Sequence, residues 1–205
     1  FPILEKEVKS FGLNVEITEK EKTVDSDIKS AFLKGNTREH MLLFYPNSPL
    51  LGISSNELIK IKFEVDINPP KYANFEPQFK LLPAPYEVNL YDAPSLFAGK
   101  LHAVICRSWK NRIKGRDLYD YVFYLSKGTQ FNLPHLKERL VQTEAIAPEK
   151  NLTIDDVKNM LIEKFDAIDY DQAKKDVIPF IKDTKSIDIW SANFFKAITQ
   201  GLRCE

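Results

Sequence analysis

The sequence predicts an α+β protein in which a sheet-rich part, residues 1–91, precedes a helical part, residues 92–205. Two observations support this prediction. Before residue 92, apolar residues alternate with polar ones in short runs interrupted by prolines and glycines, which is typical of β-strands. After residue 92, apolar residues recur at steps of three and four, which is typical of amphipathic α-helices. We expect the strands to form a mixed β-sheet.

The composition is that of an ordinary globular protein. With 205 residues, 43% hydrophobic and 28% charged, the chain can bury a core and form one or two domains. Lys and Arg number 29, as do Asp and Glu, so the zero net charge argues against a wholly basic nucleic-acid coat protein but allows a local basic patch. Cys106 and Cys204 match no metal-binding spacing, and no apolar run approaches the ~18 residues of a membrane span. We therefore expect a reduced, cytoplasmic protein that does not enter membranes.

The clearest strand is predicted at residues 57–67, E-L-I-K-I-K-F-E-V-D-I, where apolar and polar residues alternate. Its apolar face holds Ile59, Ile61, Phe63, Val65 and Ile67, and its polar face holds Lys60, Lys62, Glu64 and Asp66. Shorter signals predict a helix at 2–11, strands at 13–20, 28–34, 41–45, 79–82 and 86–91, and a turn at Gly35-Asn36.

The polar face of this strand has two interpretations. Carboxylates such as Glu64 and Asp66, projecting from a strand, are oxygen ligands that Mg²⁺ takes and shares with phosphates. The alternative, which the pattern alone favours, is a solvated strand face whose acids and lysines form ion pairs.

Residues 92–124 predict two helices joined by a basic turn. Asp92 or Ser95 can cap the first helix, and Gly115 is a plausible break before a second helix at 116–125. The turn combines cations with one aromatic ring; its residues are Arg107, Trp109, Lys110, Arg112, Lys114 and Arg116. Such a stretch suits a phosphate backbone or a triphosphate, and an exposed basic loop is an equally good interpretation.

Other charges of this hairpin lie close to the basic turn. Lys100 and Arg107, seven positions apart, share one helical face, and Asp117 and Asp120 begin the second helix. Together they are suited to hold phosphates and a metal. The alternatives are that Lys100 is a surface residue, which the pattern favours, and that the acids stabilise the positive end of the helix.

Several common catalytic motifs do not occur. The sequence has no G-x-S-x-G, P-loop or G-x-G-x-x-G motif, and its three histidines are isolated. D-x-D occurs at residues 25–27 and 169–171, where we interpret it as loop or helix-cap residues. The remaining helices are predicted at 133–142, 154–165, 172–181 and 187–202, and Thr153 with Asp156 resembles a capping box.

The run S-L-F-A-G-K to R-D-L-Y-D-Y at residues 95–121 resembles the K…R…RD-x-Y-D motif of the AbiEii/AbiGii nucleotidyltransferase toxin family. The strand I-K-I-K-F-E-V-D-I-N-P-P resembles that family's K-x-E motif, and S-A-F-L-K-G-N-T resembles a strand before it. The likeness spans residues 1–140 and is strongest over 59–125. It implies a polymerase-β-like nucleotidyltransferase domain followed by a helical domain. It also implies a toxin of type IV toxin–antitoxin and abortive-infection systems, which act in phage defence.

The resemblance implies a chemistry and a set of site residues. Members of the family transfer a nucleotide from an NTP with Mg²⁺, some of them to the acceptor end of tRNA, and a cognate antitoxin is the expected partner. By position, Glu64 matches the carboxylate of the K-x-E motif and is assigned to catalysis and metal binding, with Asp66 as an alternate metal ligand. Lys100 matches the catalytic lysine that contacts phosphates, and Asp117 matches the RD aspartate. Substrate binding is assigned to Lys62, Arg107, Arg112, Arg116 and Asp120.

The family's first motif, a Gly-Ser turn followed by a D-x-D strand with the main metal-binding carboxylates, does not occur in these 205 residues. We therefore expect the chain to be the carboxyl-terminal portion of such a toxin and to be inactive as a transferase by itself. The second hypothesis is a non-catalytic module that binds nucleic acid or a protein through residues 107–116. A native gene that encodes the first motif upstream of Phe1 would favour the enzyme.

Overall fold

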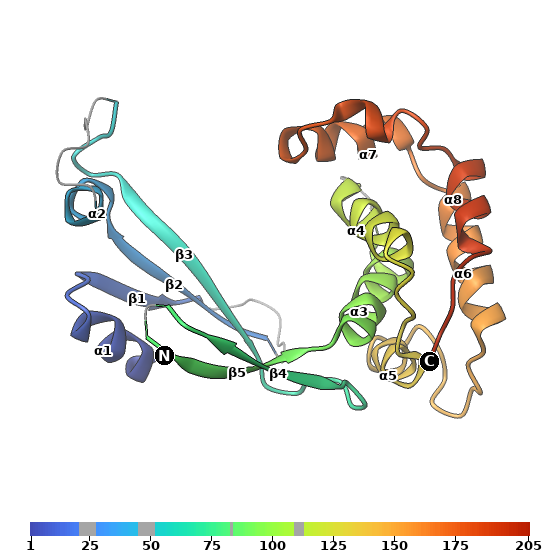
Figure 1. Ribbon diagram of the computed structural model, residues 1–205, viewed down its shortest axis with the longest axis horizontal. Helices are drawn as coiled ribbons and strands as arrows, with labels where there is room; N and C mark the ends of the chain where they lie inside the picture. The colour runs from blue at the N-terminus through green and yellow to red at the C-terminus, as the bar shows by residue number, and fades with distance from the viewer. Residues whose placement is uncertain (21–27, 45–51, 83, 109–112) are drawn as a thin grey trace. The chain divides into compact units, whose positions relative to one another are not determined.

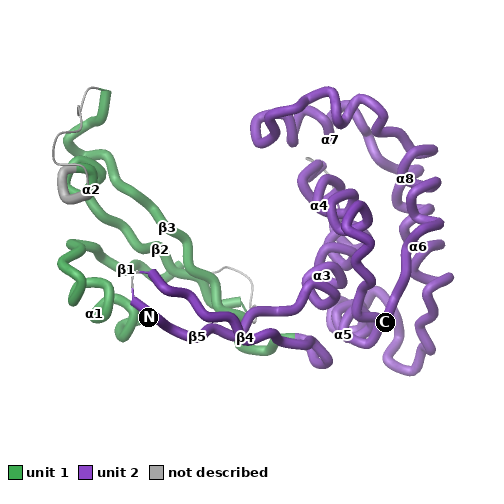
Figure 2. Tube along the Cα trace, viewed as in Figure 1, with its two compact units in different colours: residues 1–69 green, residues 70–205 purple. Residues whose placement is uncertain are grey.

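The computed structural model describes residues 1–20, 28–44, 52–82, 84–108 and 113–205, with the backbone alone for residues 42–44. The described chain forms two compact units, Phe1–Pro69 and Pro70–Glu205 (Figure 2). The first unit holds a three-stranded sheet, and the second holds a β-hairpin and most of the helices (Figure 1).

The first unit is built on an antiparallel sheet. Its elements are α1 (Pro2–Ser10), β1 (Val15–Glu19), β2 (Ile28–Asn36), α2 (Thr37–Phe44) and β3 (Leu58–Asp66). The strand order is β1-β2-β3, and the register pairs Ile17 with Leu33 and Leu33 with Ile61. Because side chains alternate along a strand, these three residues share one face of the sheet. The strand predicted at residues 57–67 is confirmed as β3.

Helix α2 corrects two predictions. The strand predicted at residues 41–45 is wrong, because residues 37–44 are helical, and the predicted turn at Gly35-Asn36 is wrong, because β2 continues through both residues. The Asn36 side chain accepts a hydrogen bond from the Glu39 amide at 3.1 Å, as a helix N-cap does, so the strand passes directly into the helix. The apolar run M-L-L-F-Y is too short for its periodicity to distinguish a strand from a helix end.

The second unit combines a β-hairpin with helices. The hairpin pairs β4 (Phe75–Lys80) with β5 (Tyr86–Tyr91). The helices are α3 (Ala93–Cys106), α4 (Gly115–Ser126), α5 (Leu133–Gln142), α6 (Ile154–Asp166), α7 (Tyr170–Val177) and α8 (Ala192–Thr199), with 3₁₀ turns η1 (Ile178–Phe180) and η2 (Thr184–Ile187) between α7 and α8. The chain changes from strands to helices between β5 and α3, whereas the compact units divide earlier, between Pro69 and Pro70. None of the helices in the described ranges is long and apolar enough to cross a membrane.

The strands pair differently from the prediction. We predicted a mixed sheet, but every pairing among the described strands is antiparallel. Residues 20–27 connect β1 to β2, and residues 81–85 connect β4 to β5. Because a parallel neighbour needs a crossover of about a dozen residues or more, connections this short return the chain antiparallel.

Side-chain caps mark where several helices begin. Asp92 Oδ1 accepts a hydrogen bond at 2.8 Å from the amide three residues on, so Asp92 is the cap of α3. Thr153 and Asp156 form the predicted capping box at the start of α6. Asp169 caps α7, which confirms the helix-cap interpretation of the D-x-D at residues 169–171. The D-x-D at residues 25–27 lies outside the described residues.

An aromatic core joins α4 to α6 and α8. The ring of Phe195 lies 5.0 Å from that of Phe165 and 6.3 Å from that of Tyr121, measured between centroids. The Tyr121 hydroxyl donates to Thr199 Oγ1 at 2.8 Å, and that hydroxyl donates to the Phe195 carbonyl at 2.7 Å. Burial raises the pKa of the Tyr121 phenol far above its ordinary value, so the phenol stays a neutral donor. This core sets the position of α4 and of the residues at its start.

Candidate functional site

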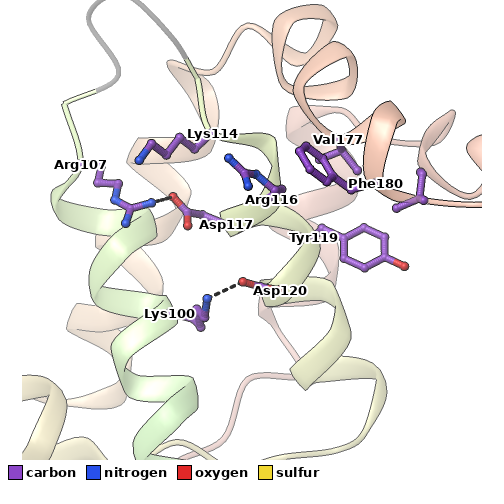
Figure 3. A pocket seen from close by; sticks show the side chains of 10 residues that line it. Lys100, Arg107, Lys114, Arg116, Asp117, Tyr119, Asp120, Val177 and Phe180 are labelled. Carbon is purple, nitrogen blue, oxygen red and sulfur yellow. Dashed lines mark hydrogen bonds and ion pairs between the residues drawn. The ribbon is translucent and has the colours of Figure 1, made fainter. Parts of the chain in front are cut away.

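A pocket of about 440 Å³ opens in the second unit, bounded by α3, α4 and the end of α7 (Figure 3). Its charged lining consists of Lys100, Arg107, Lys114, Arg116, Asp117 and Asp120. Tyr119, Val177 and Phe180 lie on the side opposite Lys100 and Arg107 (Figure 3). Among the described residues, four cationic side chains and two carboxylates give this lining a surplus of positive charge, which favours anions.

Two ion pairs connect α3 to α4 across the pocket. Lys100 Nζ lies 2.6 Å from Asp120 Oδ2, and the Arg107 guanidinium donates to the Asp117 carboxylate. The Asp117 side chain is only 8% exposed, whereas that of Arg107 is 44% exposed. The protein therefore holds the carboxylate while the cation reaches solvent, where an anion can contact it.

Local sequence explains how these four side chains meet. Lys100 lies within α3 and Arg107 is its C-cap residue, so a spacing of seven places both on one side. Asp117 and Asp120, three positions apart, lie on one side of the first turns of α4. Each α3 cation therefore faces one α4 carboxylate.

Helix α7 holds the other side of the pocket. Arg116 Nε lies 3.6 Å from Asp176 Oδ2, and its guanidinium carbon lies 4.6 Å from the centroid of the Phe180 ring. Gly115 allows α4 to approach α7, because a Cβ there would lie 1.9 Å from the Ala173 carbonyl oxygen. The start of α4 is thus fixed by contacts with α7 as well as with α3.

The strand residues of the predicted site lie in the first unit. Lys62 Nζ lies 2.7 Å from Glu64 Oε1, and the Ser30 hydroxyl donates to the same oxygen at 3.2 Å. Asp66 Oδ1 accepts from the Asn68 amide at 3.0 Å. The ion pair between Lys62 and Glu64 agrees with the solvated-face interpretation. The exposure of the Glu64 carboxylate also makes it accessible to a metal ion, as the metal-site interpretation requires. The assignment of Glu64 and Asp66 to a metal site therefore stays a prediction.

Most of the remaining predicted site residues lie in the pocket of the second unit, and one lies outside the described residues. Lys100, Arg107, Arg116, Asp117 and Asp120 line one pocket, and their catalytic and substrate-binding roles stay predictions. Arg112 lies outside the described residues. Within the described ranges, no group of three or more His, Cys, Asp or Glu side chains could hold a metal ion.

Sequence reasoning missed the apolar side of the pocket. Tyr119 lies inside the R-D-L-Y-D run, so its position in that motif could have indicated that it lines the site. Val177 and Phe180 come from a segment about sixty residues further on, and no local pattern connects them to α4. Lys114 belonged to the basic stretch but was assigned no role.

Two histidines with lowered pKa values lie where α3 packs against α5. Burial, helped by the charges of Arg139 and Arg107, lowers the pKa of His102 to about 4. Burial also lowers the pKa of His135, although its hydrogen bond to the Lys71 carbonyl opposes this. Arg139 Nε donates to His135 Nε2 at 2.9 Å, so His135 Nδ1 is the nitrogen that donates to Lys71 at 2.8 Å. Both rings are neutral in the folded protein.

These histidines predict a pH dependence of stability. Between about pH 6.5 and pH 4, the folded protein binds fewer protons at His102 than the unfolded chain does. The stability that neutral His102 contributes is therefore fully present above about pH 6.5 and is lost as the pH falls toward about 4. We expect Tm to decrease between about pH 7 and pH 5, and His102→Gln to make that decrease smaller. Glutamine can still hydrogen-bond Thr143, which lies 3.0 Å from His102 Nε2, but takes up no proton. Thermal melts across this range test it, and equal slopes for parent and variant would contradict it.

The described fold and pocket define an α+β protein whose cationic pocket suits phosphate groups. Residues 1–197 match the family model described as "Nucleotidyl transferase AbiEii toxin, Type IV TA system". The chain therefore belongs to the AbiEii nucleotidyltransferase toxin family of type IV toxin–antitoxin systems, which confirms the resemblance and extends it beyond residue 140. No curated protein and no solved structure matches the chain.

Proposed function

We propose that this chain takes part in NTP-dependent nucleotidyl transfer and that the pocket between α3 and α4 holds the triphosphate. The observation that supports this most is the convergence of Lys100, Arg107, Lys114 and Arg116 around the nearly buried Asp117. Arginine and lysine are the residues that bind phosphate oxygens, and phosphoryl-type transfer depends on positioning and neutralising those oxygens. The carboxylates opposite Lys100 and Arg107 hold these cations in place before the nucleotide arrives.

Mg²⁺ is the cofactor we propose. Glu64 and Asp66 alternate with Val65 along β3, so both carboxylates project from the same face of an exposed strand and offer the oxygen donors that Mg²⁺ takes. When bound, such an ion would supply positive charge of the kind that neutralises phosphate oxygens in nucleotidyl transfer. The role of these residues would be to fix the ion, and Lys62, paired with Glu64, would balance their charge while it is absent.

The family supports a proposal for the acceptor and the partner. We propose an RNA acceptor such as tRNA, a cognate antitoxin that controls the toxin in the cytoplasm, and a polymerase-β-like arrangement of the transferase domain. RNA suits the cations of residues 107–116, which can contact its backbone phosphates.

Replacing Lys100 tests the proposal. Lys100→Ala removes a charge-assisted phosphate contact, of a kind that contributes about 1.5–3 kcal/mol, so NTP affinity should fall roughly tenfold to a hundredfold. Growth arrest on induction of the natural gene should weaken in parallel, while the Tm of the purified variant stays close to the parent's because Lys100 is 41% exposed. Fluorescent-nucleotide titration, growth curves and thermal melts are the measurements.

The chain offers a matched control. Lys150 is 40% exposed and lies 2.8 Å from Asp156, so it resembles Lys100 in exposure and in its ion pair but does not line the pocket. Lys150→Ala should leave affinity and toxicity unchanged. If Lys100→Ala binds NTP like the parent, the phosphate assignment is wrong. If the parent and Lys100→Ala both bind RNA and neither of them binds NTP, the chain is a binding module.

A further inference from the structure

The pocket has an apolar side that the phosphate argument does not use. Phe180 is 62% exposed and Tyr119 is 40% exposed, although both line the pocket. Unlike the other exposed rings of the described chain, these two line one pocket together with a cluster of cations, so they offer an apolar surface on which a planar group can stack. Figure 3 shows both rings across the pocket from Lys100 and Arg107.

The position of the Phe180 ring is fixed by a contact with a cation as well as by the backbone turn that carries it. It ends the turn η1, and the Arg116 guanidinium carbon lies 4.6 Å from its centroid, a cation–π contact. Arg116 in turn lies 3.6 Å from Asp176, whose side chain is 4% exposed. This chain of contacts restrains the ring while most of its surface faces solvent.

We propose that Phe180, with Tyr119, stacks on a nucleobase whose phosphate groups lie among Lys100, Arg107 and Lys114. Base stacking on aromatic side chains beside backbone-binding cations is the general way in which proteins hold single-stranded nucleotides. The proposal rests on the proposed function for the position of the phosphates and adds the group that recognises the base. The base belongs either to the NTP or to the terminal nucleotide of the RNA acceptor.

Two probes separate these sources. 2-Aminopurine loses fluorescence when it stacks, so we would titrate the protein expressed from its natural gene with 2-aminopurine riboside triphosphate and with a short RNA that ends in 2-aminopurine. Quenching of the first probe assigns the base to the NTP, and quenching of the second assigns it to the acceptor. For the probe that the parent protein quenches, Phe180→Leu should abolish the quenching and lower the affinity roughly tenfold to a hundredfold. Phe180→Trp should retain the quenching and the affinity.

Two controls keep this result distinct from the proposed function. Phe123 is also exposed and also lies under a cation, with Lys127 Nζ 5.9 Å from its ring, but it does not line the pocket, so Phe123→Leu should change nothing. Inorganic triphosphate has no base, so it should bind the parent and Phe180→Leu equally. Absence of triphosphate binding would overturn the phosphate site itself. Triphosphate binding without quenching of either probe, or quenching that survives Phe180→Leu in a folded variant, would overturn the stacking proposal alone.

Discussion

Gly115→Ala should destabilise the second unit strongly, because the added methyl has no space. An ideal Cβ at Gly115 would lie 1.9 Å from the Ala173 carbonyl oxygen and 2.8 Å from both the Ala173 carbonyl carbon and Val177 Cγ2. Two of these atoms belong to the backbone, so the clash is relieved only if α4 and α7 separate. Overpacking of this kind costs about 1–3 kcal/mol or more, and we expect Tm to fall by roughly 5–10 °C.

The same substitution should also weaken nucleotide binding. Ile113, just before α4, donates its amide to Gln172 Oε1 of α7 at 2.7 Å, and Asp117 lies in the first turn of α4. Separating the two helices would break the first contact and displace the carboxylate that holds Arg107. Thermal melts and nucleotide titration on the same preparation measure both effects.

Gly99→Ala is the matched control for this prediction. Gly99 lies inside α3, and a Cβ there would be 3.5 Å from the Arg139 guanidinium carbon, an ordinary contact. Alanine is the better helix residue by about 0.5–1 kcal/mol, so Gly99→Ala should keep or raise Tm. A Gly115→Ala protein as stable as the Gly99→Ala protein would show that α4 and α7 do not pack this closely.

Asp117→Asn should reduce nucleotidyl transfer by about a hundredfold or more while leaving the fold intact. The amide has the shape of the carboxylate but no charge, so it loses the ion pair with Arg107 and can keep only a weaker hydrogen bond through its oxygen. Arg107 is 44% exposed and can turn into solvent, which limits the loss of stability but misplaces a cation of the pocket. Misplacement of a positioning group by about 1 Å costs on the order of a hundredfold in rate.

The measurement is transfer of labelled nucleotide to total tRNA by the natural gene product and its variants, with a thermal melt of each protein. Asp166→Asn is the control, because Asp166 also pairs with a cation, Lys196 at 2.5 Å, but does not line the pocket. It should transfer like the parent. Normal transfer by Asp117→Asn would remove Asp117 from the site.

Local signals in the sequence were sufficient for most of the elements. Helix α5 begins and ends where the apolar spacing predicts, and α3 and α6 begin at the caps that Asp92 and Thr153 provide. Local spacing also places Lys100 and Arg107 on one face of α3, and Asp117 and Asp120 on one face of α4. The ion pairs between these two faces depend on how the helices pack. The run at residues 41–45 was misassigned because its signal was short and the cap at Asn36 was not recognised.

The sequence by itself therefore determined the α+β class and the family, and it singled out most of the charged residues that line the pocket in the described chain. Caps, periodicity and motif spacing act over a few residues, so they can be recognised locally. The tertiary structure decided what completes the pocket. Phe180 reaches it only because α7 packs on α4, and α7 packs there only because Gly115 leaves room for the Ala173 carbonyl. Contacts between segments about sixty residues apart depend on how whole helices pack, and packing leaves no periodic signal in the sequence of either segment.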